Sequence, residues 1–169
     1  MDADVWRVIF TDNAQTIEVR RPANFQMSAG VNSAAGQVCA NLEQHSVREV
    51  SDSLARLPPA TRQVIEVVNI NVDPRYFQNN ATGQSSPYYM SATWSGGEVA
   101  VYPVCHEPDD TYRTGTLAHE AGHLVAFEAF GTDLTAGGWP RWQQAGARDG
   151  RTISNYAAAT ILEDFAETY

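Results

Sequence analysis

The sequence contains no lysine: all 11 of its basic residues are arginine, set against 20 acidic residues, for a formal net charge of −9. Nucleic acids and anionic membrane surfaces are both bound through basic patches. We therefore expect no nucleic-acid partner. The acidic balance is compatible with a cationic substrate, but the need for solubility would account for it equally well.

Long apolar runs are also missing. No run approaches the roughly 18–20 residues that cross a bilayer, so we expect no membrane span. The start, Met1-Asp2-Ala3-Asp4, is acidic and is not the positively charged head of a signal peptide. Two compartments stay open: the cytoplasm, or the outside of the cell if a leader has been removed.

Cysteine is scarce. Cys39 and Cys105 have 65 residues between them, which suits one long-loop disulfide in an exported protein or, equally, two buried thiols. The length of 169 residues fits one domain, and 43% hydrophobic residues suffice for a core that does not depend on a disulfide.

The first two thirds of the chain alternate between strand and helix patterns. β-rich runs at 5–10 and 16–20 flank a turn-forming stretch and predict a hairpin. Apolar spacing predicts a helix over 34–57 that ends before Pro58-Pro59. Further on we expect a buried strand over 64–72, a loop over 79–87, and strands over 90–94 and 98–104. Pro103 suggests that the last of these is an edge strand.

The last third is helical. Asp109 or Asp110 can cap a helix that runs to Phe130 and ends at Gly131. We expect a short helix near Trp142 and a final helix over 155–169. Strands and helices in this order predict an α+β domain.

The segment His119-Glu120-Ala121-Gly122-His123 carries the strongest chemical signal. Residues four apart share one face of a helix, so both imidazoles can reach one Zn²⁺. Glu120 lies about 100° further round, where it can reach a water on the metal. Gly122 weakens the helix but lets other backbone approach closely. The alternative is an exposed helix face that carries His and Glu by chance.

A zinc hydrolase needs a third protein ligand. The HExxH form with a third histidine six residues on is excluded, because that position is Ala129. The other form takes a glutamate from a later helix, for which Glu163 is the candidate. Glu167, one turn further, can accept the free ring N–H of a ligating histidine. Both glutamates could instead be solvent-facing charges.

Three segments together resemble the catalytic domain of anthrax lethal factor and its relatives, among them the clostridial Pro-Pro endopeptidases, which are secreted zinc metallopeptidases. They are His119-Glu-Ala-Gly-His123, Ser154-Asn155-Tyr156-Ala157 and Glu163-Asp-Phe-Ala-Glu167. The resemblance covers about residues 98–169, and residues 1–97 carry no motif that we can match.

The resemblance implies a gluzincin-like fold: a small mixed sheet, an active-site helix with HExxH, and a C-terminal helix with the third zinc ligand. It implies His119, His123 and Glu163 as ligands of Zn²⁺, Glu120 as general base and Tyr156 as donor to the oxyanion. It also implies an edge strand that binds an extended peptide, matching Glu98, Ala100 and Tyr102. Without the resemblance, Tyr156 would be read as a packed aromatic residue.

We therefore expect a single-domain, monomeric and secreted zinc metalloendopeptidase with a peptide or protein substrate, its catalytic part being 98–169. Two alternatives remain: a zinc hydrolase of a small-molecule amide, and an interaction module with a vestigial site. Two weaker candidates are His45, which is read as structural, and His106 beside Cys105 and Glu107, which is read as a surface loop residue. Trp139 and Trp142 could line the cleft or cover the core, and 79–87 could form a lid.

Overall fold

A computed structural model of the chain describes residues 3–23, 46–78, 85–93, 96–103 and 109–169. Cys39 and Cys105, for which the sequence leaves both a disulfide and two buried thiols open, lie outside these residues, as do His45 and His106. Strands and helices are mixed in the described ranges, which confirms the α+β class.

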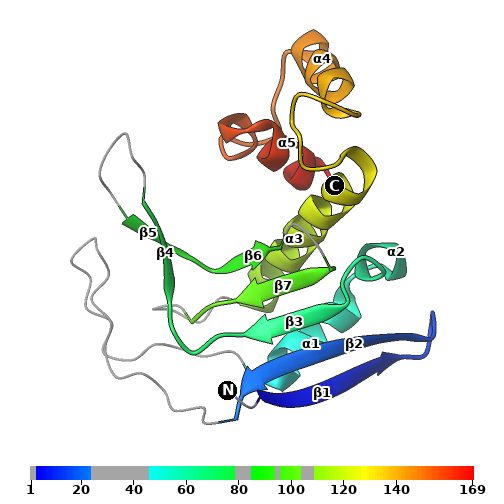
Figure 1. Cartoon of the computed structure of the whole chain (residues 1–169), viewed down its shortest axis with the longest axis vertical. Helices are drawn as coiled ribbons and strands as arrows, with labels where there is room; N and C mark the ends of the chain where they lie inside the picture. The colour runs from blue at the N-terminus through cyan, green and yellow to red at the C-terminus, as the bar shows by residue number, and fades with distance from the viewer. Residues whose placement is uncertain (1–2, 24–45, 79–84, 94–95, 104–108) are drawn as a thin grey trace.

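Five strands form a mixed sheet in the order β1-β2-β3-β7-β6 (Figure 1). β1 (Ala3–Phe10) and β2 (Gln15–Pro22) form the predicted antiparallel hairpin. β3 (Val67–Ile70) runs parallel to β2 and to β7 (Glu98–Val101). β6 (Met90–Ala92) pairs antiparallel with β7 and forms the edge of the sheet on that side.

The core lies between this sheet and two helices, α1 (Val47–Arg56) and α3 (Asp110–Phe130), which both lie behind the sheet in Figure 1. Alternate residues of the strands point inward, as the period of two requires. The buried set from the inner strands and helices includes Ile17, Val19, Val68, Ile70, Val99, Val101, Val50, Leu54, Leu117, Ala121 and Leu124. Burial of these residues fixes the position of α3 against β6 and β7.

Two boundaries in the first two thirds differ from prediction. The helix expected from residue 34 begins at Val47, because Ser46 accepts a hydrogen bond from the Glu49 N–H and the Glu49 carboxylate accepts one from the Ser46 N–H. The expected loop over 79–87 is partly strand: β4 (Arg75–Gln78) pairs with β5 (Ser85–Tyr88), and 79–84 lie outside the described residues. A short helix, α2 (Pro59–Arg62), follows Pro58.

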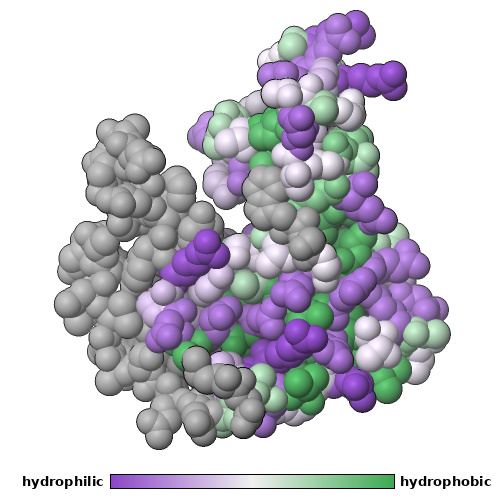
Figure 2. Space-filling view, in the orientation of Figure 1, coloured by the Kyte–Doolittle hydropathy of each residue, from purple (hydrophilic) through white to green (hydrophobic). Residues whose placement is uncertain are grey.

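The C-terminal third covers the far end of α3 (Figure 1). α4 (Trp139–Asp149) is longer than the short helix predicted near Trp142. The predicted final helix is split into a 3₁₀ turn, η1 (Ala157–Ala159), and α5 (Ile161–Thr168), because Thr160 is extended and caps α5. Figure 2 shows this third as a narrow projection above the broad part that carries the sheet. No helix in the described ranges has the combined length and hydropathy of a membrane span.

Candidate metal centre

Helix α3 presents His119, Glu120 and His123 where its buried stripe meets a cavity. Asp109 caps the helix through the Tyr112 N–H, at 2.7 Å, and Gly131 ends it at a φ of 76°, as predicted. The two imidazole rings meet edge to face with centroids 4.7 Å apart, and their Nε2 atoms are 3.1 Å apart. Spacing of one helical turn therefore brings both Nε2 atoms to the same point.

Helix α5 brings Glu163 to that point. Thr160 accepts a hydrogen bond from the Glu163 N–H at 3.2 Å and so starts the helix directly before the carboxylate. Oε2 of Glu163 lies 3.0 Å from Nε2 of His119 and 3.4 Å from Nε2 of His123. His119, His123 and Glu163 form a three-residue group that could hold a metal ion, with candidate ligand atoms all within 4.8 Å of one another.

These separations fit a four-coordinate metal. Ligand atoms about 2.0–2.1 Å from zinc at the corners of a tetrahedron lie about 3.3 Å from one another. The observed separations among the two Nε2 atoms and Oε2 are 3.0, 3.1 and 3.4 Å. Within the described part of the chain, Oε2 of Glu163 is buried and accepts no well-aligned hydrogen bond. The donor set therefore fits Zn²⁺.

The electrostatics keep Glu163 ionised. Burial alone would raise its pKa, but the close approach of His119 and His123 outweighs burial and lowers the pKa to about 2. For His119, burial alone would lower the pKa, but the neighbouring carboxylates, Glu163 first, outweigh burial and raise it. A half-buried anion beside two imidazoles is the charge arrangement that a divalent cation would complete.

The two histidines differ in what holds their rings. Nδ1 of His119 lies 3.0 Å from Oε1 of Glu167, which in turn accepts a hydrogen bond at Oε2 from the Ser154 hydroxyl at 2.8 Å. Nδ1 of His123 is buried and has no hydrogen-bond partner among the described residues. Its ring stacks instead on Phe127, with centroids 6.2 Å apart. Among the described residues, a carboxylate therefore orients the ring of His119 but not that of His123.

Gly122 allows the two helices to meet. A Cβ atom at this position would lie 2.9 Å from Cα and 3.1 Å from the carbonyl oxygen of Ala166, and 3.1 Å from Cβ of Tyr169. Backbone cannot give way as a flexible side chain can. The close approach predicted for Gly122 is thus confirmed, and the backbone it admits belongs to α5.

Glu120 faces the cavity from a nearly enclosed position. Its side chain is 6% exposed, and its Oε2 accepts a hydrogen bond from the Ala92 N–H of β6 at 2.6 Å. Burial raises the pKa of Glu120, an effect opposed by His123, His119 and the bond from Ala92. A carboxylate with a raised pKa beside two histidines that could hold a metal is a good proton acceptor.

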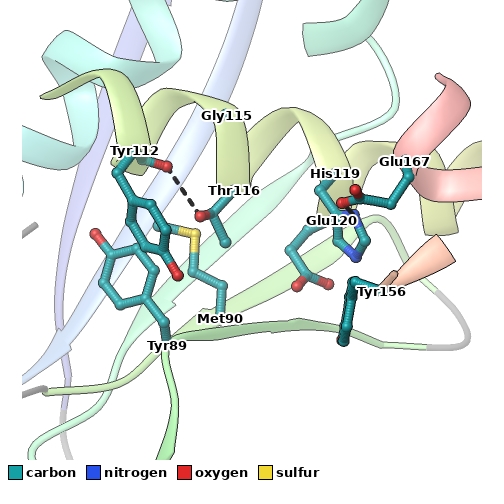
Figure 3. Close-up of a pocket in the computed structure, with 9 residues that line it drawn as sticks. All are labelled: Tyr89, Met90, Tyr112, Gly115, Thr116, His119, Glu120, Tyr156 and Glu167. Carbon is teal, nitrogen blue, oxygen red and sulfur yellow. Dashed lines mark hydrogen bonds and ion pairs between the residues drawn. The ribbon is translucent and has the colours of Figure 1, made fainter. Parts of the chain in front are cut away.

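A cavity of about 560 Å³ opens beside these residues (Figure 3). One end of the cavity is lined by His119, Glu120, Tyr156 and Glu167. The other end is lined by an aromatic pair, Tyr89 and Tyr112, whose ring centroids are 5.6 Å apart. The remaining lining residues are Met90, Gly115 and Thr116. The Tyr156 ring lies 5.6 Å from the His119 ring and is 55% exposed, so it is not a packed core residue.

The structure therefore gathers six predicted residues at one place: His119, Glu120, His123, Tyr156, Glu163 and Glu167. Sequence reasoning missed the other cavity residues on α3. The signal was present, because Tyr112 and Gly115 lie seven and four residues before His119 and so share its helical face.

The prediction of an edge strand at Glu98, Ala100 and Tyr102 is wrong. β7 lies between β3 and β6, so its backbone is paired on both sides, and Tyr102 also bonds to Tyr89 of the β6 side. The side chains of Glu98 and Tyr102 contact Asn69 and Arg75. Pro103 follows the strand instead of lying within it. The edge nearest the cavity is β6.

Trp139 and Trp142 do not line the cavity beside His119. Trp139 is fully buried, donates its ring N–H to the Gly131 carbonyl at 2.9 Å and packs edge to face on Phe130 and Phe165. Trp142 packs on Phe165 and donates to Asp164 at 2.9 Å. Trp139 therefore joins α4 to α3 and α5, and Trp142 joins α4 to α5. Of the two roles expected for them, both tryptophans have the covering role.

Comparison of the chain with family models, with curated proteins and with solved structures gave no match.

Proposed function

We propose that the protein is a zinc-dependent metalloendopeptidase of the gluzincin type. The observation that carries the proposal is the convergence of His119, His123 and Glu163 beside a cavity that Glu120 also faces. Two histidines and a glutamate are a catalytic zinc set, which leaves the fourth position open. The motif resemblance to the lethal factor catalytic domain supports the same assignment.

The chain's own residues supply the proton transfers. Zn²⁺ held by the three ligands would polarise a carbonyl and make water more acidic. Glu120 takes a proton from the water as its oxygen adds to the peptide carbonyl carbon, and gives that proton to the amine when the C–N bond breaks. The products are a carboxylic acid and an amine, so atoms and charge balance. The Ala92 N–H keeps the Glu120 carboxylate aimed at the cavity.

Tyr156 is placed to stabilise the negative charge that develops on the carbonyl oxygen. Its ring lies beside His119 on the wall of the cavity, on a segment that leaves it accessible. A phenolic O–H aimed at a developing oxyanion lowers the barrier, and loss of one such donor costs about 10²–10³ in rate.

Strand β6 offers the backbone for an extended peptide. Thr93 and Tyr89 bond to β7 across the antiparallel pair, so the outward N–H and C=O groups of β6 belong to Met90 and Ala92. The Ala92 N–H is used by Glu120 and Met90 is 3% exposed, which leaves the Ala92 carbonyl for a substrate. A strand edge beside the metal site favours peptides over small-molecule amides as substrates.

Metal analysis and a peptide-library digest together test the proposal. The purified protein is expected to hold about one Zn²⁺ per chain and to cleave defined peptide bonds. Glu120→Gln should keep the metal and lose cleavage by at least about 10²-fold. Glu128→Gln, an exposed position on the same helix, is the matched control and should cleave normally. Failure to take up zinc rejects the proposal, and zinc uptake without peptide cleavage favours a non-peptide amide as substrate.

A further inference from the structure

The segment that carries Tyr156 is largely exposed to solvent. From Gly150 to Thr160 every side chain is exposed except those of Ser154 and Ala157. An exposed segment of this kind needs specific bonds to hold one side chain in a defined place. Ser154 makes two of them.

One hydroxyl group serves both bonds. Oγ of Ser154 accepts a hydrogen bond from the Ala157 N–H at 2.9 Å and lies 2.8 Å from Oε2 of Glu167. The backbone N–H can only donate, so the single hydroxyl proton is available for the carboxylate. The bond to an ionised carboxylate is of the stronger, charge-assisted kind.

The bond from Ser154 to Glu167 affects the proposed metal ligand His119. Glu167 uses its two oxygens separately: Oε2 accepts from Ser154, and Oε1 lies 3.0 Å from Nδ1 of His119. With both oxygens engaged the carboxylate cannot rotate freely. It therefore holds the proton of His119 on Nδ1 and leaves the Nε2 lone pair towards Glu163 and His123.

The bond between Ser154 and the Ala157 N–H affects the position of Tyr156. The Ala157 N–H belongs to the peptide that directly follows Tyr156, and the Tyr156 carbonyl accepts from the Ala159 N–H at 2.9 Å in the same turn. Together these bonds fix the backbone on the C-terminal side of Tyr156. The ring is then held 5.6 Å from the His119 ring, at the cavity wall.

We propose that Ser154 is a positioning residue that sets the orientation of His119 and the place of Tyr156 through one hydroxyl group. The inference rests on the proposed zinc site and peptidase function. Loss of the hydroxyl alone weakens metal binding through Glu167 and slows turnover through Tyr156, while the fold is retained.

Two variants of equal size separate the hydroxyl from its bulk. Ser154→Thr keeps the hydroxyl, and Ser154→Val replaces it with a methyl group of the same shape. Zn²⁺ affinity is measured by competition with a chelator, and kcat and KM on a peptide that the wild type cleaves. Asn155→Ala, at an exposed neighbour, is the control for general effects on the segment.

We expect Ser154→Thr and Asn155→Ala to stay within about threefold of the wild type in both measurements. Ser154→Val should bind Zn²⁺ about tenfold more weakly and lose about tenfold or more in kcat with little change in KM. Double-variant cycles locate the cause. The loss of affinity should not add to that of Glu167→Gln, and the loss in kcat should not add to that of Tyr156→Phe.

The outcomes distinguish this inference from the proposed function. If the wild type binds Zn²⁺ and cleaves peptides while Ser154→Val matches it in both, this inference alone is wrong. Fully additive cycles also reject it, because they show a general structural effect. If the wild type binds Zn²⁺ but cleaves no peptide, the peptidase proposal fails and an unchanged affinity of Ser154→Val would reject this inference separately. A wild type that takes up no Zn²⁺ rejects both.

Discussion

The α3 side of the candidate metal centre is enclosed by the core, whereas its C-terminal side has few buried residues. Beside His119 and His123, Leu117 and Ala121 are fully buried and Glu120 is nearly so. From Gly131 to Tyr169 only Trp139, Ala157 and Ala166 are buried. The core therefore fixes the side that supplies the two histidines and Glu120. The side that supplies Glu163, Glu167 and Tyr156 is fixed by helix caps, by aromatic packing and by the contacts of Glu163 with the histidines.

This difference indicates what a bound metal would do for the structure. α5 has eight residues, and helices shorter than about 12–15 residues are marginal by themselves. Glu163, which it carries, is a half-buried anion that lies beside two imidazoles. A bound cation would join the weakly packed side to the well-packed one, so that metal binding and local order in the C-terminal third depend on each other.

The largest effect is expected where the two sides touch. Gly122→Ala places a Cβ 2.9 Å from Cα of Ala166 and must push α5 away. We expect a loss of Zn²⁺ binding and at least about a hundredfold fall in activity, because a displacement near 1 Å can cost that much. Zinc content and peptide cleavage are the measurements.

Gly115→Ala is the matched control for that change. It lies in the same helix, and a Cβ there has no atom within 4 Å. Both substitutions favour the helix by roughly 0.5–1 kcal/mol, so the two variants differ in the contact with α5. Zinc content is the measurement compared, because Gly115 also lines the cavity. Equal zinc content in the two variants would contradict the role of the α3–α5 contact.

The next effect comes from removal of the metal. With a chelator present, backbone amides of α5 should lose hydrogen-exchange protection, by up to about 4 kcal/mol if zinc is supplied at a thousand times its dissociation constant. Amides of β3 and β7, which pair within the core, should keep their protection. Exchange measured by mass spectrometry with and without zinc tests this. An equal loss in β3 and α5 would show one cooperative unit and remove the contrast.

Local signals made the α3 side predictable. The cap at Asp109, the stop at Gly131 and the one-turn spacing of the histidines all act within one helix, so the sequence shows them directly. The spacing of Glu163 and Glu167 identified the later helix in the same way. Their position against His119 followed from the motif resemblance and not from any local pattern.

Pairing between distant segments was not predictable. The parallel pairing of β7 with β3 depends on contacts that no short pattern encodes, so an interior strand was taken for an edge strand. Two helix boundaries failed for a local reason that was overlooked. Ser46 and Thr160 both accept bonds from the N–H three residues on, and each starts a helix where a continuous one was expected.

A smaller effect is expected within the α3 side. Ala92→Pro removes the N–H that bonds Glu120 and takes no bond from the sheet, because the Ala92 N–H points away from β7. Loss of a bond to a charged group predicts about a 10–100-fold fall in kcat, with unchanged zinc content and melting temperature. Ala92→Ser keeps the N–H and should behave as the wild type. Unchanged turnover in the proline variant would show that Glu120 needs no support from β6.

The smallest effect concerns stability at the start of α3, far from the metal ligands. Asp110 lies 2.7 Å from Arg56 of α1 and 2.8 Å from Arg113, and its bond with Arg56 lowers the pKa of the Asp110 carboxyl. As the pH falls, the unfolded chain takes up this proton first. The contribution is therefore complete above the ordinary pKa of about 4 and is lost as the pH falls through the lowered value. Asp110→Asn should lower the urea midpoint slightly at pH 7, with zinc content unchanged, and this difference from the wild type should shrink as the pH falls through the acid range. Asp52→Asn, whose exposed pair with Arg48 is longer at 3.7 Å, should shift the midpoint less. If Asp110→Asn altered zinc content, the position of the histidines would depend on this surface ion pair and not on the core alone.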